Sequence, residues 1–100
     1  MNNPILGLKK EFESRVKLGI MSILMVHTEM DYNDLKNILQ VTDGNLASHL
    51  KSLEHLNYIK MEKAFEGRKT KTTYSVTRNG KKAFEEHLNA LEILVQSNQS

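Results

Sequence analysis

Two amphipathic segments separated by a very short polar turn restrict the folds that this chain can adopt. The first, residues 33–39, has its apolar side chains at helical spacing, and we expect Asn33 to cap it. The second has Thr42 or Asp43 as its expected N-cap and carries a stripe of Leu46, Leu50, Leu53 and Leu56. At about 100° per residue, these leucines span an arc of about 120°, which is the buried face of a helix. The sequence therefore predicts two helices packed in close succession.

Further helices are predicted on both sides of this pair. Apolar residues recur at 16, 20, 23 and 24, which predicts a helix over residues 15–27 with Ser14 as its N-cap. Residues 78–96 are predicted to form a last amphipathic helix with Thr77 as its N-cap. Ahead of the first helix, apolar residues at 5, 8 and 12 predict either a short leading helix or an arm. Asp31 and Tyr32 are expected to form a very short strand.

A β-hairpin is predicted before the last helix. Residues 58–65 place Ile59, Met61 and Phe65 on one face at period two, and residues 72–77 alternate in the same way. The segment between them, residues 66–71, has a glycine and four charged side chains and is expected to be the loop. The predicted fold class is mainly α with a small β-hairpin (α+β), in a single domain of residues 1–100.

Basic charge is concentrated in the middle of the sequence. Residues 36–82 hold ten basic and four acidic side chains, although the net charge of the whole chain is only +2. A local basic surface on a balanced domain favours nucleic-acid binding, but solvated lysine-rich faces also occur in proteins that bind nothing.

The side of the second helix that lies opposite its leucines carries small and polar side chains. Small residues at 44, 47, 48 and 52 would let this helix approach DNA closely, and its N-terminus carries partial positive charge. The candidate DNA contacts, which can all hydrogen-bond to bases or phosphates, are Asn45, Ser48, His49, Lys51 and Ser52. An ordinary solvated helix face is the alternative, and His49 lies near enough to the leucines to pack in the core instead.

Three further candidate DNA contacts, Arg68, Lys69 and Lys71, lie in the predicted hairpin loop. A braced helix followed by a basic hairpin is the arrangement of a winged helix-turn-helix, in which the helix lies in the major groove and the hairpin contacts flanking phosphates. A solvated loop would also explain such a charge run. Its position directly after the candidate recognition helix favours phosphate binding.

The stretch GNLASHLKSLEHLNYIKMEKAFEGRKTKTTYSVTRNGKKAF resembles the small winged-helix DNA-binding regulators related to the MarR and ArsR classes. The similarity runs from about Arg15 to Phe84. Ala47, Asn57 and Val76 depart from the family pattern, which usually has serine, glycine and leucine at these positions. The resemblance implies a dimeric transcriptional regulator that presents residues 45–52 to the major groove and residues 68–71 to the flanking backbone. It also implies that Gly80 lets helix and hairpin pack closely.

The two ends of the chain carry more apolar side chains than so small a core needs. The predicted dimerisation residues are Ile5, Leu8 and Phe12 in the segment 1–13 and Leu88, Leu91 and Val95 in the segment 84–100. Packing of these side chains on their own domain is the alternative. A dimer would place two recognition helices about 34 Å apart and would bind a pseudo-palindromic operator.

Patterns typical of enzymes and metal sites are missing from the sequence. The four histidines form no His-x-x-x-His pair, and neither a nucleophile triad nor a glycine-rich phosphate loop is present. His87 with Glu85 and Glu86 does not predict a metal site, because adjacent residues on a helix do not converge on one ion. We therefore expect no catalysis, no metal and no cofactor. Methionines at 21, 25 and 30 leave the binding of a small effector open.

The predicted function is sequence-specific binding of double-stranded DNA by a homodimeric transcriptional regulator. The chain has no cysteine, no secretory signal pattern and no apolar run of about 20 residues, so we expect a cytoplasmic protein without a membrane segment. The alternative function is that of a winged-helix protein–protein interaction module, in which the polar helix or the terminal helices dock another protein.

Overall fold

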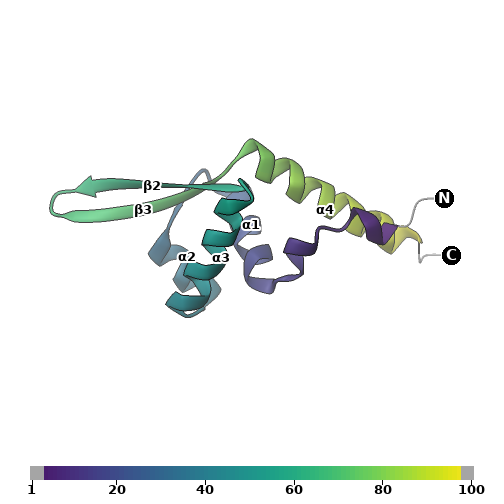
Figure 1. Cartoon of the computed structure of the whole chain (residues 1–100), viewed down its shortest axis with the longest axis horizontal. Helices are drawn as coiled ribbons and strands as arrows, with labels where there is room; N and C mark the ends of the chain where they lie inside the picture. Colours follow the sequence, from purple (N-terminus) through teal and green to yellow (C-terminus); the bar gives the residue numbers. More distant parts are fainter. Residues whose placement is uncertain (1–3, 98–100) are drawn as a thin grey trace.

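Four α-helices and a three-stranded antiparallel sheet form the fold of residues 4–97, the residues that the computed structural model describes (Figure 1). In chain order the elements are the 3₁₀ helices η1 (Pro4–Gly7) and η2 (Lys10–Glu13), then α1 (Arg15–Val26), β1 (Met30–Asp31), α2 (Tyr32–Leu39), α3 (Asp43–His55), β2 (Ile59–Glu66), β3 (Lys69–Val76) and α4 (Arg78–Ser97). The predicted fold class, mainly α with a small β-hairpin, is confirmed.

Hydroxyl side chains cap α1, α3 and α4, as the sequence predicts. Ser14, Thr42 and Thr77 each accept a hydrogen bond from the backbone N–H three residues later, over 3.2, 3.3 and 2.9 Å. Each bond satisfies one of the backbone donors that the first turn of a helix leaves unpaired. The caps therefore fix where these three helices begin.

Helix α2 begins two residues earlier than predicted, and Asp31 caps it in place of Asn33. The Asp31 Oδ1 atom accepts a hydrogen bond from the Asp34 N–H over 2.7 Å. Such a bond to a charged carboxylate is shorter and stronger than a bond to a neutral amide oxygen. Tyr32 consequently lies in the first turn of α2, and the short strand is Met30–Asp31.

Side chains from α1, α2 and α3 meet at the centre of the core. At most 1% of the surface is exposed for Ile20, Met21, Leu24, Leu35, Leu46, Leu50 and Leu53. Leu56, which was expected to continue the α3 stripe, is 39% exposed. Leu56 is the C-cap of α3, and Asn57 turns the chain directly after it with a left-handed φ of 61°, so this last leucine of the stripe lies at the end of the helix. Asparagine tolerates this conformation, which explains why it can stand where the family pattern has glycine.

The hairpin is longer than predicted, and its loop is shorter. Strand β3 lies between β1 and β2, and β2 pairs with β3 from Ile59 opposite Val76 out to Glu66 opposite Lys69. Only Gly67 and Arg68 lie outside the strands, so most of the charged segment 66–71 is part of the sheet. Gly67 has a φ of +65°, and a positive φ at the first of two turn residues is typical of a tight type II′ hairpin turn.

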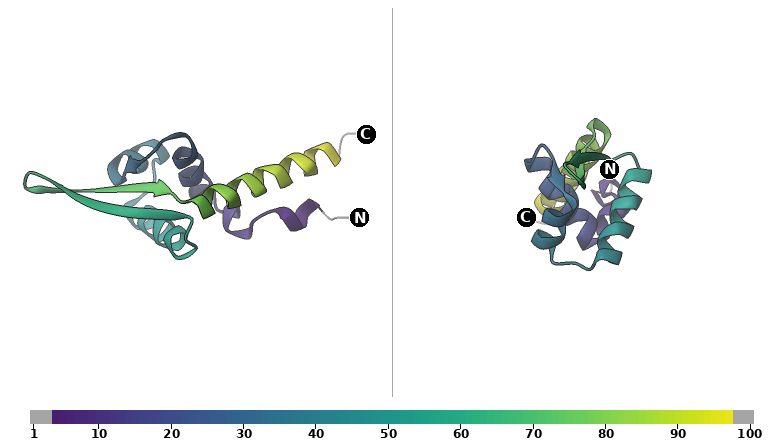
Figure 2. Two further views of the ribbon diagram at one scale, coloured as in Figure 1. Left: turned by 90° about the horizontal axis from the view of Figure 1, so that it is seen from above. Right: turned by 90° about the vertical axis from the view of Figure 1, so that its left-hand side faces the viewer.

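The hairpin projects well beyond the helices, and we refer to residues 59–76 as the wing (Figures 1 and 2). The radius of gyration is 15.5 Å, compared with about 13 Å for a compact chain of this length. Ile59 is 2% exposed, Met61 39% and Phe65 80%. Burial of this face therefore decreases along the strand, because the outer wing extends past the helices that bury its base.

Helix α4 projects at the opposite end of the molecule, and the N-terminal segment lies beside it (Figures 1 and 2). The leading segment is a pair of short 3₁₀ helices, and η1 packs closely on the C-terminal half of α4. A Cβ atom added to Gly7 would lie 2.9 Å from the Cβ of Ala90. Of the two predicted terminal segments, residues 1–3 and 98–100 lie outside the described residues.

Phe12 belongs to the core of its own chain. It is 3% exposed, and its ring centroid lies 5.8 Å from that of Tyr58, 5.6 Å from that of Phe84 and 5.1 Å from that of His87. The inclusion of Phe12 among the dimerisation residues rested on a need for burial by a partner chain, and that reasoning is wrong.

Gly80 lies directly against the turn between α3 and the wing, as the family resemblance implies. A Cβ atom at this position would overlap the carbonyl oxygen of Tyr58 and would lie 2.9 Å from Cγ2 of Val76. The same Tyr58 carbonyl accepts a hydrogen bond from the Thr77 N–H over 2.9 Å. The start of α4 is therefore fixed to the base of the wing.

Candidate nucleic-acid interface

The exposed face of α3 carries three of the predicted DNA contacts. Asn45, Ser48 and Lys51 are exposed and follow one another at intervals of three residues, so they lie on one side of the helix. Among residues 4–97, no carboxylate lies within 4.0 Å of the Lys51 ammonium group. This face consequently offers hydrogen-bonding groups and one unneutralised positive charge.

Ser52 and His49 lie at the margins of the same face and are half-buried. His49 is adjacent in sequence to the fully buried Leu50, at the boundary between the leucine stripe and the exposed side. The remaining polar groups of the face stand nearer to solvent, so we place Asn45, Ser48 and Lys51 at its centre.

Gly44 leaves the backbone uncovered by a side chain at the beginning of this face. A Cβ atom added to Gly44 would have no neighbour within 4 Å, so no packing contact inside the chain requires glycine here. A missing side chain at an exposed position next to a helix N-terminus lets another molecule approach the backbone closely.

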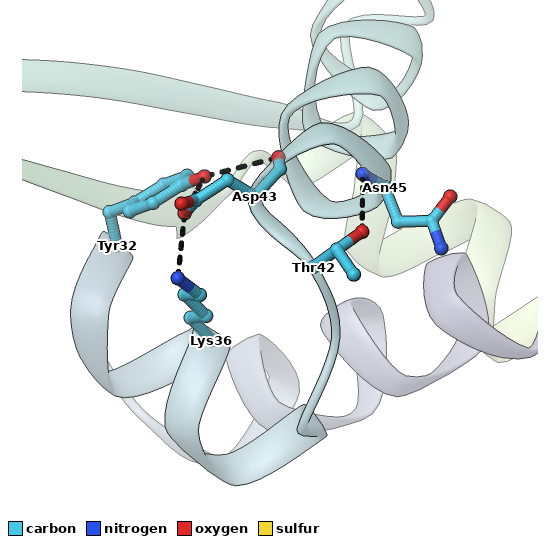
Figure 3. A network of polar contacts seen from close by, with 5 residues as sticks. All are labelled: Tyr32, Lys36, Thr42, Asp43 and Asn45. Carbon is cyan, nitrogen blue, oxygen red and sulfur yellow. Dashed lines mark hydrogen bonds and ion pairs between the residues drawn. The ribbon is translucent and has the colours of Figure 1, made fainter.

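A polar network holds the start of α3 against α2 (Figure 3). The hydroxyl of Tyr32 donates to the Asp43 carboxylate over 3.1 Å and lies 3.3 Å from the Asp43 carbonyl oxygen. The ammonium group of Lys36 forms an ion pair with the same carboxylate oxygen, Oδ1, over 3.0 Å. Sequence patterns did not single out Tyr32, Lys36 or Asp43, because the network arises only when the two helices pack.

This network also determines the charge of the Asp43 side chain at the start of the candidate recognition helix. The hydrogen bond from Lys36, followed by the one from Tyr32, lowers the pKa of the Asp43 carboxyl, so this side chain is ionised at neutral pH. The ammonium of Lys36 compensates its charge. Asp43 therefore adds little net negative charge to the surface formed by Asn45, Ser48 and Lys51.

The wing carries the other three predicted contacts at and near its tip. Arg68 lies in the two-residue turn, and Lys69 and Lys71 lie in β3. The Lys71 ammonium group is 3.6 Å from the Glu66 carboxylate, whereas neither Arg68 nor Lys69 has a carboxylate partner within 4.0 Å in the described part of the chain. Two of the three positive charges are therefore unpaired.

A groove of about 560 Å³ separates the wing from the start of α2, and we refer to it as the wing groove. Its walls include Tyr32 and Asn33 on one side and Lys63, Lys69 and Lys71 on the other. It also contains two carboxylates, of which Glu66 is paired with Lys71 and Asp31 caps α2. Lys63 is a further cation that the sequence did not single out, because it interrupts an apolar alternation.

The wing groove and the exposed face of α3 are connected through one residue. Tyr32 lines the groove and also donates its hydroxyl hydrogen bond to Asp43, the first residue of α3. The wing groove therefore extends to the start of α3, the helix that carries Asn45, Ser48 and Lys51.

This geometry agrees with a match to a known protein family. The family model of the winged helix DNA-binding domain matches residues 16–95. The chain belongs to this family. The match covers α1 to α4 of the winged-helix domain and includes both surfaces described above.

Relatives with substantial coverage are found among archaeal proteins. An uncharacterised protein of Methanocaldococcus jannaschii is 34% identical over 79 residues, which are 79% of this chain and 86% of that protein. A transcriptional regulator homologue from Pyrococcus horikoshii OT3, whose structure has been solved, is 26% identical in sequence. The two structures superpose with a TM-score of 0.78, and the match covers 91% of this chain and 95% of the Pyrococcus chain.

Two solved regulators of lower identity share the fold. PadR of Bacillus subtilis, solved in complex with operator DNA, is 20% identical, with a TM-score of 0.67 over 75% of this chain and 47% of its own. MarR is also 20% identical, with a TM-score of 0.70 over 85% of this chain and 64% of its own. The expected resemblance to MarR-type winged-helix regulators is confirmed at the level of the fold.

Neither a membrane helix nor a cluster of metal ligands occurs within residues 4–97. No helix there is both long and apolar enough to cross a bilayer. In the same residues, no three His, Asp or Glu side chains gather as ligands for a metal ion. The Nδ1 atom of His87 instead accepts a hydrogen bond from the Lys9 N–H over 3.0 Å.

Proposed function

We propose that this protein is a homodimeric transcriptional regulator that binds double-stranded DNA sequence-specifically in the cytoplasm. The observation that carries the proposal is that Tyr32 joins the wing groove to the start of α3. In this arrangement α3 lies in the major groove, while the wing contacts the phosphates beside it.

Base reading is assigned to the exposed face of α3. The side chains of Asn45 and Ser48 can donate and accept hydrogen bonds at base edges, and Lys51 can donate to guanine or to a phosphate. The open space around Gly44 supports a close approach of the first helical turn to the duplex. Ser52 and His49 contribute from the margins of the face, where they are half-buried.

Phosphate binding is assigned to the cations of the wing. Arg68 and Lys69 have no carboxylate partner among the described residues, so their charges are available to a nucleic-acid backbone. Lys63 and Lys71 line the wing groove and add to this positive charge. Contacts of this kind position a protein on DNA without reading sequence, and they make its affinity fall as salt rises.

Dimerisation is assigned to α4 and the N-terminal segment. Leu88, Leu91 and Val95 are 47%, 37% and 56% exposed, and their spacing of three and four residues forms a continuous apolar stripe. Ile5, which is 60% exposed, and the half-buried Leu8 lie in the segment beside α4. A second copy that covers this stripe across a two-fold axis would bury it and would place two α3 helices about 34 Å apart.

The proposal is tested by comparing two double variants in fluorescence anisotropy with labelled duplexes. Replacing Asn45 and Ser48 by alanine should reduce the difference in affinity between preferred and mixed sequences, by about 1–3 kcal/mol for each base pair that is no longer read. Replacing Arg68 and Lys69 by alanine should weaken binding to all sequences and reduce the salt slope by roughly 0.9 for each phosphate that is no longer neutralised.

A matched control is available outside the wing and α3. Lys10 and Arg15 are exposed and have no carboxylate partner within 4.0 Å among residues 4–97, so their replacement by alanine removes the same charge as the wing variant. An equal loss of affinity in both charge variants would contradict a specific role of the wing. No binding of any duplex by the wild type at low salt would favour the protein-interaction module instead.

A further inference from the structure

An exposed aromatic ring stands near the tip of the wing. Phe65 is 80% exposed, although burial of an aromatic side chain is among the larger favourable contributions to folding. The turn residues Gly67 and Arg68 follow it closely, and Thr70 lies directly opposite it on β3. The ring therefore has small or polar neighbours and adds little to the packing of this chain.

Strand alternation places Phe65 on the side of the wing that faces the wing groove. Lys63, two residues earlier, and Thr70, the cross-strand partner, share its face of the hairpin, and both line that groove. The carboxylates Glu62 and Glu66 alternate to the other face of β2, where Lys60 lies 3.5 Å from Glu62 and Lys71 lies 3.6 Å from Glu66. Glu66 and Lys71 also reach the wing groove, where they remain paired with each other. The acids are thus paired with lysines, and the aromatic face is left with a lysine and threonines.

The surroundings of the ring suit one kind of surface. Lys63 shares the face of Phe65, Arg68 lies in the turn and Lys69 lies on the other face of β3. None of these three cations has a carboxylate partner within 4.0 Å among the described residues. An exposed aromatic side chain with cations nearby is complementary to a molecule that presents phosphates beside flat apolar faces. Duplex DNA has this pattern, and apolar side chains including phenylalanine act there as wedges between base pairs in the minor groove.

We propose that Phe65 is a wedge that inserts at a base step beside the sequence read by α3. The inference rests on the proposed function, because with α3 in the major groove the wing tip meets the adjacent minor groove. Insertion unstacks the step locally and kinks the duplex toward its major groove, and the phosphates that border the opened minor groove can then contact Lys63 and Arg68. Phe65 then favours steps that unstack easily, such as TA or CA, outside the sequence that α3 contacts.

The test is a series of bound duplexes in which the fluorescent base 2-aminopurine replaces adenine at successive flanking positions. Unstacking raises the fluorescence of this base, so wild-type protein should brighten it at one step on each side of the site. Phe65→Ala should abolish the increase and weaken binding by about 5- to 150-fold, the range expected when an aromatic side chain that stacks on a base is removed. Phe65→Leu should retain part of the increase, because leucine is also used as a wedge.

Two controls separate this inference from the proposed function. Val26→Ala removes an equally exposed apolar side chain, also 80% exposed, at the end of α1 and should change neither fluorescence nor affinity. Both variants should unfold at the wild-type temperature, since neither side chain is buried. The wedge proposal is wrong, and the proposed function stands, if the wild type binds duplexes without raising the 2-aminopurine fluorescence at any position. The same conclusion holds if Phe65→Ala raises the fluorescence and binds as the wild type does. If wild type binds no duplex at low salt, both are wrong.

Discussion

The imidazole of His87 in α4 accepts a hydrogen bond at Nδ1 from the backbone N–H of Lys9, over 3.0 Å and between residues 78 positions apart. The His87 side chain is buried, and the hydroxyl of Tyr58 nearby donates to the Glu11 carboxylate over 2.7 Å. Burial, reinforced by this bond to Glu11, raises the pKa of Tyr58 to about 12, so the hydroxyl keeps its proton. These two bonds join the N-terminal segment to α4 and to the base of the wing.

The first prediction concerns the pH dependence of stability. Burial lowers the pKa of His87 below its ordinary value of 6.5, an effect that the charge of Glu11 opposes and that of Lys9 reinforces. The unfolded chain therefore binds this proton more readily, so the contribution of His87 to stability is complete above about pH 6.5 and is lost as the pH falls through its folded-state pKa. We expect the free energy of unfolding in urea to decrease between about pH 7 and about pH 5.

The variant His87→Asn tests this assignment, because an amide oxygen can still accept the Lys9 hydrogen bond but does not titrate in this range. Its free energy of unfolding should depend less on pH than that of the wild type. The neighbouring carboxyls do not interfere, because the pKa of Glu86 is lowered by Lys9, and the pKa of Glu11, despite the opposing effect of burial, is lowered by Tyr58. Equal slopes in the two proteins would show that another group causes the decrease.

Gly80→Ala is expected to destabilise the fold. The added Cβ would overlap the Tyr58 carbonyl oxygen, and that backbone group is held in place by the Thr77 N–H. Overpacking of this kind typically costs about 1–3 kcal/mol, which exceeds the gain of up to about 1 kcal/mol from alanine in a helix. Urea unfolding measures the change, and a variant as stable as the wild type would mean that the chain can shift here at little cost.

Gly44→Ala should have the opposite effect on stability and should reduce DNA binding. Its Cβ meets no atom within 4 Å, so the fold should be unchanged or more stable by up to about 1 kcal/mol. The methyl group would stand between the first turn of α3 and the duplex, and we expect affinity to fall by about tenfold, equivalent to the effect of one mismatched base pair. Unfolding and anisotropy measured on the same preparation check both effects, and unchanged affinity would place the duplex farther from this turn.

The dimer proposal predicts a monomer when the α4 stripe is made polar. Leu88→Lys combined with Leu91→Lys introduces two charges at positions that are 47% and 37% exposed, so the fold of one chain should persist. Sedimentation should change from dimer to monomer, and the unfolding temperature should no longer depend on protein concentration. Val26→Lys is the matched control at an exposed site away from α4 and should remain dimeric. A wild-type monomer at micromolar concentration would contradict the proposal.

The sequence predicted the order of elements and most helix starts, because caps and apolar spacing act locally. Ser14, Thr42 and Thr77 cap the helices as expected. For α2 the predicted cap was Asn33, but Asp31, which was expected only in a short strand, caps the helix. The α3 face was predictable because its leucines fix which side is buried and therefore which side carries Asn45, Ser48 and Lys51.

The tertiary features of the site were not predictable in this way. Period-two spacing indicates which residues share a face of the wing, but not whether another element covers that face, so the exposure of Met61 and Phe65 could not be predicted. The contacts among Tyr32, Lys36 and Asp43 depend on how α2 and α3 pack, because Tyr32 and Asp43 are 11 positions apart. Phe12 was assigned to a dimer because its apolar spacing does not reveal that Tyr58, Phe84 and His87 surround it.

The most direct test of sequence-specific DNA binding is selection of the wild-type protein against a pool of random-sequence duplexes, followed by measurement of the affinity for the enriched duplex across salt concentrations. We predict an enriched inverted repeat with half-sites about one helical turn apart, and a logarithm of affinity that falls linearly with the logarithm of salt by about 0.9 per phosphate contact. A pool that stays unenriched, with no measurable binding even at low salt, would contradict the assignment of α3 and the wing to DNA.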